Sequence, residues 1–336
     1  MKKIKNKSDK NIFFLIFDEL GKLGEGEGFG EFDFKKFFKG IFIEKTDEEL
    51  ENSLIVGTSK TTPSISELFI KYPEPWLFGR LMLGSLVLFY GFIGIYKQFE
   101  VANLIPAIIF TGSFSVPVST IFLFFEINIR RNISIWQVMR LILLGGFLSI
   151  FITIILFENS SIWNGPTGAW FASFIEEPAK LIAVLILVKD KQKYPYILNG
   201  LVFGASIGCG FAAFESAGYA LSYGMDDINS LIGLIQLRGI LSPFAHIIWT
   251  AISAASFWRV QNCRKFNYKL FFKKKFFIPF FVIVFLHAIW NSASLIPFKG
   301  LYFILGIVGW TLILSLINLG IIELKNEQKG KINFMN

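Results

Sequence analysis

GLVFGASIGCGFAAFE, from Gly200 to Glu215, is almost entirely apolar until its last residue, which is an acid. It belongs to a mostly apolar run over residues 196 to 220. A membrane-spanning helix needs about 20 mostly apolar residues, and a charged side chain in hydrocarbon costs at least about 2.5 kcal/mol. Gly200, Gly204 and Gly208 recur every four residues and predict a face for close packing against another helix. The stretch therefore predicts a transmembrane helix that carries a functional carboxylate.

The whole chain has the composition of a membrane protein. Of its 336 residues, 53% are hydrophobic and 17% are charged, and the mean hydropathy is +0.55. These values exclude an ordinary soluble globular class. Apolar stretches of spanning length occur at roughly 79 to 96, 101 to 125, 139 to 157, 168 to 188, 196 to 220, 238 to 257, 276 to 295 and 301 to 322. We predict an all-α, polytopic bundle of about eight transmembrane helices that contacts the lipid bilayer and no nucleic acid.

Basic residues are concentrated in alternate loops between the predicted spans. The loops after the second, fourth and sixth spans contain Arg130 and Arg131, Lys189 to Lys193, and Arg259 to Lys275. The intervening loops, residues 157–167 and 221–230, contain no Lys or Arg. Because basic loops stay on the cytoplasmic side, we expect both termini in the cytoplasm and the protein in the plasma membrane of a bacterium.

Three regions are expected along the chain. Residues 1–75 would form a small cytosolic N-terminal region, residues 76–325 the transmembrane domain, and residues 326–336 a cytosolic tail. In the first region, Thr46 to Glu49 has the pattern of a capping box and predicts the start of a short helix. The aromatic and basic stretch from Phe32 to Phe42 would either pack as a small module or lie on the anionic inner leaflet.

Ionisable side chains in the central portions of the spans are confined to the fourth to seventh. Glu176 and Glu177 lie in the fourth, Glu215 in the fifth, His246 in the sixth and His287 in the seventh. Counted from the outer ends of these spans, most lie five to eight residues deep, which is roughly 8 to 12 Å at the rise of an α-helix. Such groups are costly in lipid, so one polar layer near the outer surface marks a functional site.

The fourth span contains a cation within one turn of its two acids. Lys180 follows Glu176 by four residues and Glu177 by three. Neighbouring side chains on a helix diverge by about 100 degrees, so Lys180 can pair with one carboxylate while the other points elsewhere. One glutamate can then act as a base while the other binds a different group.

Each histidine is followed by a hydrogen-bonding residue one turn later. Thr250 follows His246, and Asn291 follows His287. Either residue could fix the tautomer of its histidine or hold a reaction intermediate.

Two hydrolytic chemistries fit this set of residues. In the first, Glu215, His246 and His287 hold Zn²⁺ with an open position, and Glu176 is the general base. In the second, which needs no metal, a buried glutamate takes a proton from water while the histidines and Asn291 stabilise the oxyanion. Both routes hydrolyse an amide, and the residues alone leave both open.

Four motifs follow one another in the second half of the chain. They are EExxK (Glu176 to Lys180), GxGFAAFE (Gly208 to Glu215), RxxxxPxxH (Arg238 to His246) and HAIWN (His287 to Asn291). This ordered set resembles the PrsW family of intramembrane proteases, which is distantly similar to the CAAX prenyl endopeptidases and the ABI proteins. The resemblance covers about residues 165 to 295. It implies cleavage of a membrane-embedded, single-pass protein, such as an anti-sigma factor, from its outer side.

One position departs from the family pattern, since some members have Asp where this chain has Asn291. A neutral amide there cannot serve as an ionised base or a charged ligand. We expect Glu176, Glu177, Lys180 and Asn291 to take part in catalysis.

Two other functions use the same kind of residues. Buried Glu and His side chains form ion or proton pathways in transporters, although transporter folds have two related halves and no such repeat is visible here. An inactive member of the family could also act as a membrane scaffold.

Overall fold

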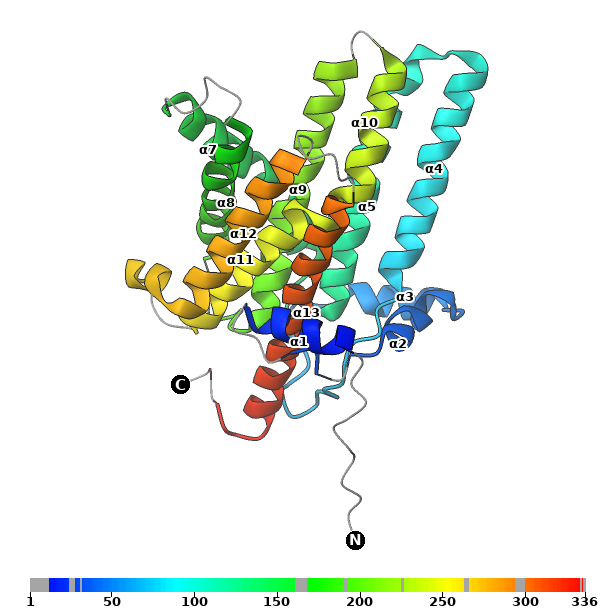
Figure 1. Ribbon diagram of the computed structural model, residues 1–336. Helices are drawn as coiled ribbons and strands as arrows, with labels where there is room; N and C mark the ends of the chain where they lie inside the picture. The colour runs from blue at the N-terminus through cyan, green and yellow to red at the C-terminus, as the bar shows by residue number, and fades with distance from the viewer. Residues whose placement is uncertain are drawn as a thin grey trace.

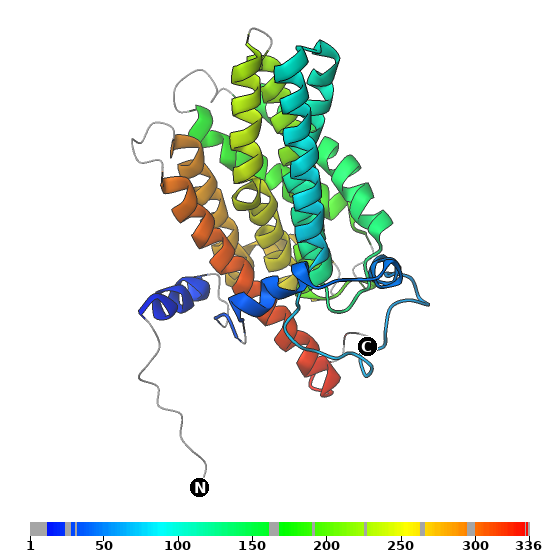
Figure 2. The same cartoon turned by 90° about the vertical axis from the view of Figure 1, so that its right-hand side faces the viewer.

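The computed structural model describes residues 12–23, 28–30, 32–160, 168–189, 192–224, 227–262, 266–293, 300–332 and 334. The regular elements in these ranges are all helices, which confirms the predicted all-α class (Figures 1 and 2). In chain order they are α1 (Ile12–Leu23), α2 (Phe34–Lys39), η2 (Gly40–Phe42), α3 (Asp47–Leu54), α4 (Leu77–Phe99), η3 (Ala102–Leu104), α5 (Ile105–Ile127), α6 (Ile135–Arg140), the π-helical turn η4 (Leu141–Gly145), α7 (Gly146–Glu158), α8 (Gly168–Leu187), α9 (Ile197–Gly224), α10 (Ile228–Leu241), η6 (Ser242–Phe244), α11 (His246–Gln261), η7 (Tyr268–Phe272), α12 (Lys274–Ser292) and α13 (Leu301–Gln328).

Each of the eight predicted spans overlaps helical residues, although the sixth is interrupted. Within the described residues, seven helical segments are long and apolar enough to cross a membrane. They are α4, η3 with α5, α6 to α7, α9, α10 to α11, α12 and α13. The fourth predicted span is α8, which has 20 residues but includes Glu176, Glu177 and Lys180. The polytopic bundle is confirmed, and the number eight stays a prediction that depends on α8.

The sixth span differs from its predicted form. A single helix was expected over residues 238–257, but α10 ends at Leu241 and α11 begins at His246. Pro243 has no backbone N–H to donate to a carbonyl of the preceding turn, and residues 242–244 form a single 3₁₀ turn, η6. Ala245 then has φ −122° and ψ −128°, which no helix contains. A residue of α13 stabilises the break, because the indole Nε1 of Trp310 donates to the carbonyl of Pro243 at 3.0 Å.

Helix α9 lies at the centre of the bundle, in direct backbone contact with α11. A Cβ atom placed on Gly200 would come within 2.7 Å of Ala255 Cα, and one on Gly208 would come within 3.0 Å of Ile247 Cα. One on Gly204 would lie within 2.7 Å of the Cβ of Ala254. The close-packing face predicted from the glycine spacing is therefore confirmed. Its effect is to fix the start of α11 against the middle of α9.

The bundle has a main hydrophobic core and a smaller second one. The second core lies between α4, α5, α9 and α10, and consists of Phe89, Ile93, Ile108, Ile109, Ala220, Leu231, Ile232 and Ile235. These four helices extend further than α7, α8 and α12 at the end of the molecule away from the chain termini (Figures 1 and 2). The helices that bear the polar layer therefore end at different heights.

The described N-terminal residues pack against the other end of the bundle. Helix α1 lies against α13, and Phe37, Val56 and Leu68 are buried in the main core (Figure 1). The predicted capping box is confirmed, since Thr46 Oγ1 accepts from the backbone of Glu49 and the Glu49 carboxylate accepts from the backbone of Thr46. The boundary near residue 75 stays a prediction, but this region is docked on the bundle rather than separate from it.

Hydrogen bonds join the basic connections to one another and to the N-terminal region. Arg131 Nη2 donates to the carbonyl of Asn52 at 2.6 Å, and Asn132 Nδ2 donates to that of Lys193 at 3.1 Å. The indole of Trp258, near the end of α11, donates to the carbonyl of Tyr194 at 2.7 Å. The basic connections thus share one end of the bundle, as the predicted topology requires. Residues 190–191 and 263–265, which also contain basic residues, lie outside the described ranges.

Candidate functional site

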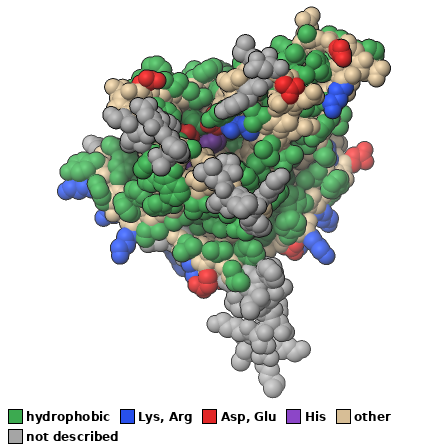
Figure 3. All heavy atoms as spheres, turned by 45° about the horizontal axis from the view of Figure 1, so that its top comes forward, with side chains coloured by type: hydrophobic (Ala, Val, Ile, Leu, Met, Phe, Trp, Pro, Cys, Tyr) green, Lys and Arg blue, Asp and Glu red, His purple; other side chains and the backbone are tan. Residues whose placement is uncertain are grey.

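A cavity of about 480 Å³ lies among the helices that carry the ionisable residues. Viewed from the end opposite the termini, it is a hollow in which acidic, basic and histidine side chains gather (Figure 3). Its polar wall includes Glu176, Glu215, Ser216, Arg238, His246 and Asn291. Its apolar wall comes from α7, α10, α12 and α13. The polar layer predicted from the sequence therefore borders a space that is large enough for part of a peptide.

Helix α8 supplies two carboxylates with different surroundings. Lys180 Nζ donates to Glu177 Oε1 at 2.6 Å but lies 3.9 Å from Glu176 Oε2. The Lys180 side chain is fully buried and also lies 4.5 Å from the centre of the Phe211 ring. The expectation that Lys180 pairs with one glutamate and leaves the other free to face elsewhere is confirmed. Glu176 is the glutamate that borders the cavity.

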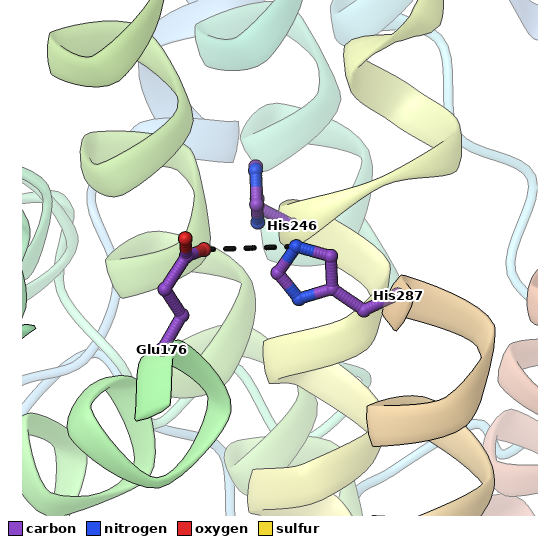
Figure 4. Close-up of side chains that lie close together, drawn as sticks. All are labelled: Glu176, His246 and His287. Atoms are coloured by element: carbon purple, nitrogen blue, oxygen red, sulfur yellow. Dashed lines mark ion pairs between the residues drawn. The ribbon is translucent and has the colours of Figure 1, made fainter. Parts of the chain in front are cut away.

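His287, on α12, lies between the two glutamates. Its Nδ1 donates to Glu177 Oε1 at 2.8 Å, because an ionised carboxylate can only accept. Its Nε2 lies 3.6 Å from Glu176 Oε2, so the unprotonated nitrogen faces the carboxylate that borders the cavity (Figure 4). The ring stacks on Trp249 with 4.4 Å between centroids. Glu177 therefore fixes both the tautomer and the orientation of His287.

His246 is the first residue of α11 and lies directly after the helix break. Lys180 Nζ donates to its Nδ1 at 2.9 Å, since a lysine ammonium has no acceptor. Its Nε2 is 3.1 Å from Glu215 Oε2 and donates to that carboxylate. The rings of His246 and His287 are 4.9 Å apart and nearly perpendicular. Both nitrogens of His246 are therefore engaged, whereas only one nitrogen of His287 is.

The residues one turn after the histidines have other partners than those expected from the sequence. Thr250 Oγ1 donates to the backbone carbonyl of His246 at 2.9 Å, which is the local bond that threonine commonly makes inside a helix. Asn291 Nδ2 donates to the carbonyl of Ala169 at 2.9 Å and joins α12 to the start of α8. Carboxylates on neighbouring helices take the place of Thr250 and Asn291 as partners of the rings. The catalytic role expected for Asn291 stays a prediction, although the residue lines the cavity.

Glu215 forms an ion pair that the sequence analysis did not identify. The Arg238 guanidinium on α10 donates to Glu215 Oε2, and Arg238 Nε donates to Ser216 Oγ at 2.9 Å. In the sequence, Arg238 was considered only as part of the RxxxxPxxH motif. The sequence contained one signal for this ion pair, because Arg238 is the only Lys or Arg between Asp227 and Arg259. A cation within a predicted span needs a carboxylate partner, and Glu215 is the nearest acid on the preceding helix.

Three buried side chains converge as metal ligands would. In the described part of the chain, one group of histidines and acids has ligand atoms that all lie within 4.8 Å of one another, namely Glu176, His246 and His287 (Figure 4). Glu176 Oε2 has no hydrogen-bond partner among the described residues. A buried carboxylate oxygen without a partner is costly, so the group fits a bound cation or a polar substrate atom. The ligand set expected from the sequence had Glu215 in the place of Glu176, but Arg238 already pairs with the Glu215 carboxylate.

Known proteins match the part of the chain that forms this site. A family model described as PrsW family intramembrane metalloprotease matches residues 134–317. Protease PrsW of Oceanobacillus iheyensis is 24% identical over 161 residues, which are 47% of this chain and 69% of that protein. Protease PrsW of Geobacillus kaustophilus is 26% identical over 159 residues, which are 46% of this chain and 65% of that protein. No solved structure matches. More than half of the chain fits the family model, so the protein belongs to the PrsW family of intramembrane metalloproteases.

Proposed function

We propose that this chain hydrolyses a peptide bond of a membrane-anchored protein in the cavity beside Glu176. The observation that carries the proposal is the Glu176 carboxylate, which borders the cavity. Its buried Oε2 has no hydrogen-bond partner among the described residues and lies 3.6 Å from His287 Nε2 and 3.9 Å from Lys180 Nζ. A carboxylate in this position can accept a proton from a water molecule held in the cavity. The water then attacks the scissile carbonyl carbon, and Glu176 returns the proton to the leaving amine as the C–N bond breaks.

The neighbouring residues orient this base and stabilise charge. Glu177 and Lys180 are bonded to each other and to the two histidines, so they hold His246 and His287 at fixed distances from Glu176. The positive charge of Lys180 stabilises the negative charge that develops on the substrate oxygen. Asn291 lies on the cavity wall, where its amide can hydrogen-bond to a bound peptide.

A metal ion fits the same residues. Zn²⁺ would be held by Glu176, His246 and His287, with Glu177 behind His287 as the carboxylate that orients a metal-bound histidine. When bound, it would act as a Lewis acid and lower the pKa of water. His246 has to exchange one of its present partners, Lys180 or Glu215, to become a ligand. The metal-independent version needs no such exchange, because Glu176 is already free to act as the base.

We propose a single-pass membrane protein as the substrate. Glu176 is eight residues from the start of α8 and Glu215 is nine from the end of α9, which places the site roughly 12 to 14 Å below these helix ends. A helix keeps its carbonyls bonded, so the substrate has to be unwound at this level. With both termini cytoplasmic, as the loop charges favour, the cut falls in the outer part of the substrate's span or its outer juxtamembrane stretch. A membrane-anchored anti-sigma factor is a substrate of this class.

Reconstitution in liposomes with a single-pass substrate tests the proposal. The purified protein should cut the substrate, and Glu176→Gln should lower the rate at least about 100-fold while the variant still purifies as a folded species. Mass spectrometry should place the cut in the outer half of the span. Ion or solute transport that depends on Glu176, with no proteolysis of any tested substrate, would favour the transporter function instead.

Metal analysis of the same samples separates the two versions of the site. A zinc enzyme should contain about one metal ion per chain, lost in His287→Ala, and a chelator should inactivate it reversibly. Full activity in a metal-free sample would establish the metal-independent version.

A further inference from the structure

The break between α10 and α11 is bridged by one side chain of another helix. Arg238 lies in the last turn of α10, and His246 is the first residue of α11. Glu215 of α9 contacts both, because its Oε2 accepts from the Arg238 guanidinium and lies 3.1 Å from His246 Nε2. The two sides of the break are thus joined through a single carboxylate oxygen.

Arg238 is held in one orientation by a single turn of α9. Its guanidinium pairs with Glu215, its Nε donates to Ser216 Oγ at 2.9 Å, and its guanidinium carbon lies 4.6 Å from the centre of the Tyr219 ring. A planar guanidinium with several donors fixes the direction of a carboxylate better than a lysine does. The Glu215 carboxylate is therefore kept in place at the edge of the cavity.

The pairing of charges also determines which glutamate stays available. The cluster contains three acids, Glu176, Glu177 and Glu215, and two cations, Lys180 and Arg238. Lys180 is hydrogen-bonded to Glu177, and Arg238 to Glu215. Without Arg238, Glu215 would pair with Lys180 or with His246 alone. Lys180 and His246 both lie close to Glu176, so either change would alter the surroundings of the base. The ion pair of Arg238 therefore keeps Glu215 from disturbing the base.

We infer that Arg238 is a positioning residue that acts through Glu215 to fix His246 beside Glu176. Glu215 is then an orienting partner of His246 rather than a metal ligand. This inference rests on the proposed proteolytic function. It predicts that loss of Arg238 lowers kcat and leaves KM nearly unchanged, because the substrate still enters the same cavity while His246 is no longer held in its reactive orientation.

A double-mutant cycle tests the inference. Arg238→Gln and Glu215→Gln should each lower kcat about 10- to 100-fold, the usual range for a residue that orients a functional histidine. The double variant should be no slower than the slower single variant, since both changes interrupt one chain of contacts. Arg238→Lys, which keeps the charge but not the planar fork, should recover part of the activity. Arg140→Gln is the matched control, because that arginine donates to the carbonyl of Leu187 and does not line the cavity.

A second measurement does not depend on activity. The chain has two histidines, so NMR of protein with ¹⁵N-labelled histidine should give two assignable sets of ring signals. At one fixed pH, Arg238→Gln should change the signals of His246, whose Nε2–H donates to Glu215, and leave those of His287, whose partner is Glu177.

The outcomes distinguish this inference from the proposed function. If the wild type cleaves no substrate, the proposed function fails, and the NMR result still reports whether Arg238 orients His246. If the wild type cleaves but the effects of the two substitutions multiply, Arg238 acts on the substrate directly and the inference is overturned. An unchanged His246 signal in Arg238→Gln overturns it as well.

Discussion

Two cavities of nearly equal size in the described part of the chain have polar residues that are organised differently. One, of about 480 Å³, is lined by Glu176 and His246, while the other, of about 450 Å³, lies between the N-terminal region and the bundle. The second cavity also has acids and bases on its wall, including Lys45, Glu49 and Glu126. Size and the presence of charge therefore do not separate the two.

Burial and pairing do separate them. In the second cavity Lys45 and Glu49 form a partly exposed pair at 3.0 Å. Glu126 accepts the backbone N–H groups of Trp76, Leu77 and Phe78 at the start of α4, and so has a structural task. In the site cavity Glu176 and His246 are buried, and the partly exposed Glu215 is bonded to both His246 and Arg238. A buried group with an unpartnered atom indicates chemistry, whereas a group that caps a helix indicates folding.

The largest difference between the cavities should appear in activity. Glu176→Gln is expected to lower kcat by 100-fold or more, because it removes the base. Glu126→Gln is the matched change in the other cavity and should leave kcat within about twofold, since the amide oxygen can still accept from the start of α4. Cleavage rates in liposomes measure both. Equal losses of kcat in the two variants would contradict a catalytic role confined to the cavity of Glu176.

Stability should show a second, smaller difference. Lys180→Met leaves Glu177 buried without its cation and should lower the free energy of unfolding by about 3–5 kcal/mol. Lys45→Met removes a partly exposed pair in the other cavity and should cost about 0–1 kcal/mol. Unfolding of the purified variants in mixed detergent micelles compares the two. A small effect of Lys180→Met would show that Glu177 does not depend on this lysine.

A third change concerns the second cavity alone. Glu126→Ala leaves three backbone N–H groups at the start of α4 without their acceptor and should cost about 1–2 kcal/mol of stability. The folded fraction should keep normal cleavage activity. The check is the cleavage rate per folded molecule, with the folded fraction at the assay temperature taken from the melting curve. A loss of kcat at full folding would assign the second cavity a part in catalysis.

The smallest expected effect comes from a glycine outside the face that joins α9 and α11. Gly84→Ala should change stability by less than about 0.5 kcal/mol, because no atom lies within 4 Å of the added Cβ. Gly200→Ala should destabilise by about 1–3 kcal/mol, since its Cβ would meet the backbone of Ala255. Thermal unfolding of both variants in one detergent gives the comparison. Similar melting temperatures would contradict the close approach of α9 and α11.

Much of the fold could be predicted because it follows from local patterns. Apolar length located the helices, glycine spacing located the close-packing face of α9, and the spacing on α8 predicted that Lys180 pairs with one of the two glutamates. The break at residues 242–245 could not be predicted with the same ease. Pro117, Pro178 and Pro279 lie inside continuous helices, so Pro243 alone was not a sufficient signal.

The composition of the site was predictable, but its pairing was not. Which carboxylate joins the histidines depends on the rotation of α8 and α9 about their axes, and the sequence leaves that open. Arg238 decides the outcome by engaging Glu215, a residue 23 positions earlier on the preceding helix. The docking of the N-terminal region likewise rests on single bonds such as the one from Arg131 to Asn52, which no periodicity reveals.

The glycine contacts between α9 and α11 also have a mechanical consequence. Helices whose backbones touch cannot slide or separate without losing many contacts at once, so Glu215 and His246 move as one body. Glu176 and His287 lie on a second pair, α8 and α12, which pack through larger side chains such as Phe174 and Phe285. Admission of a substrate by a shift of the second pair would therefore also separate Glu176 from His246, and the reactive arrangement would form again only after the two pairs close around the chain to be cut.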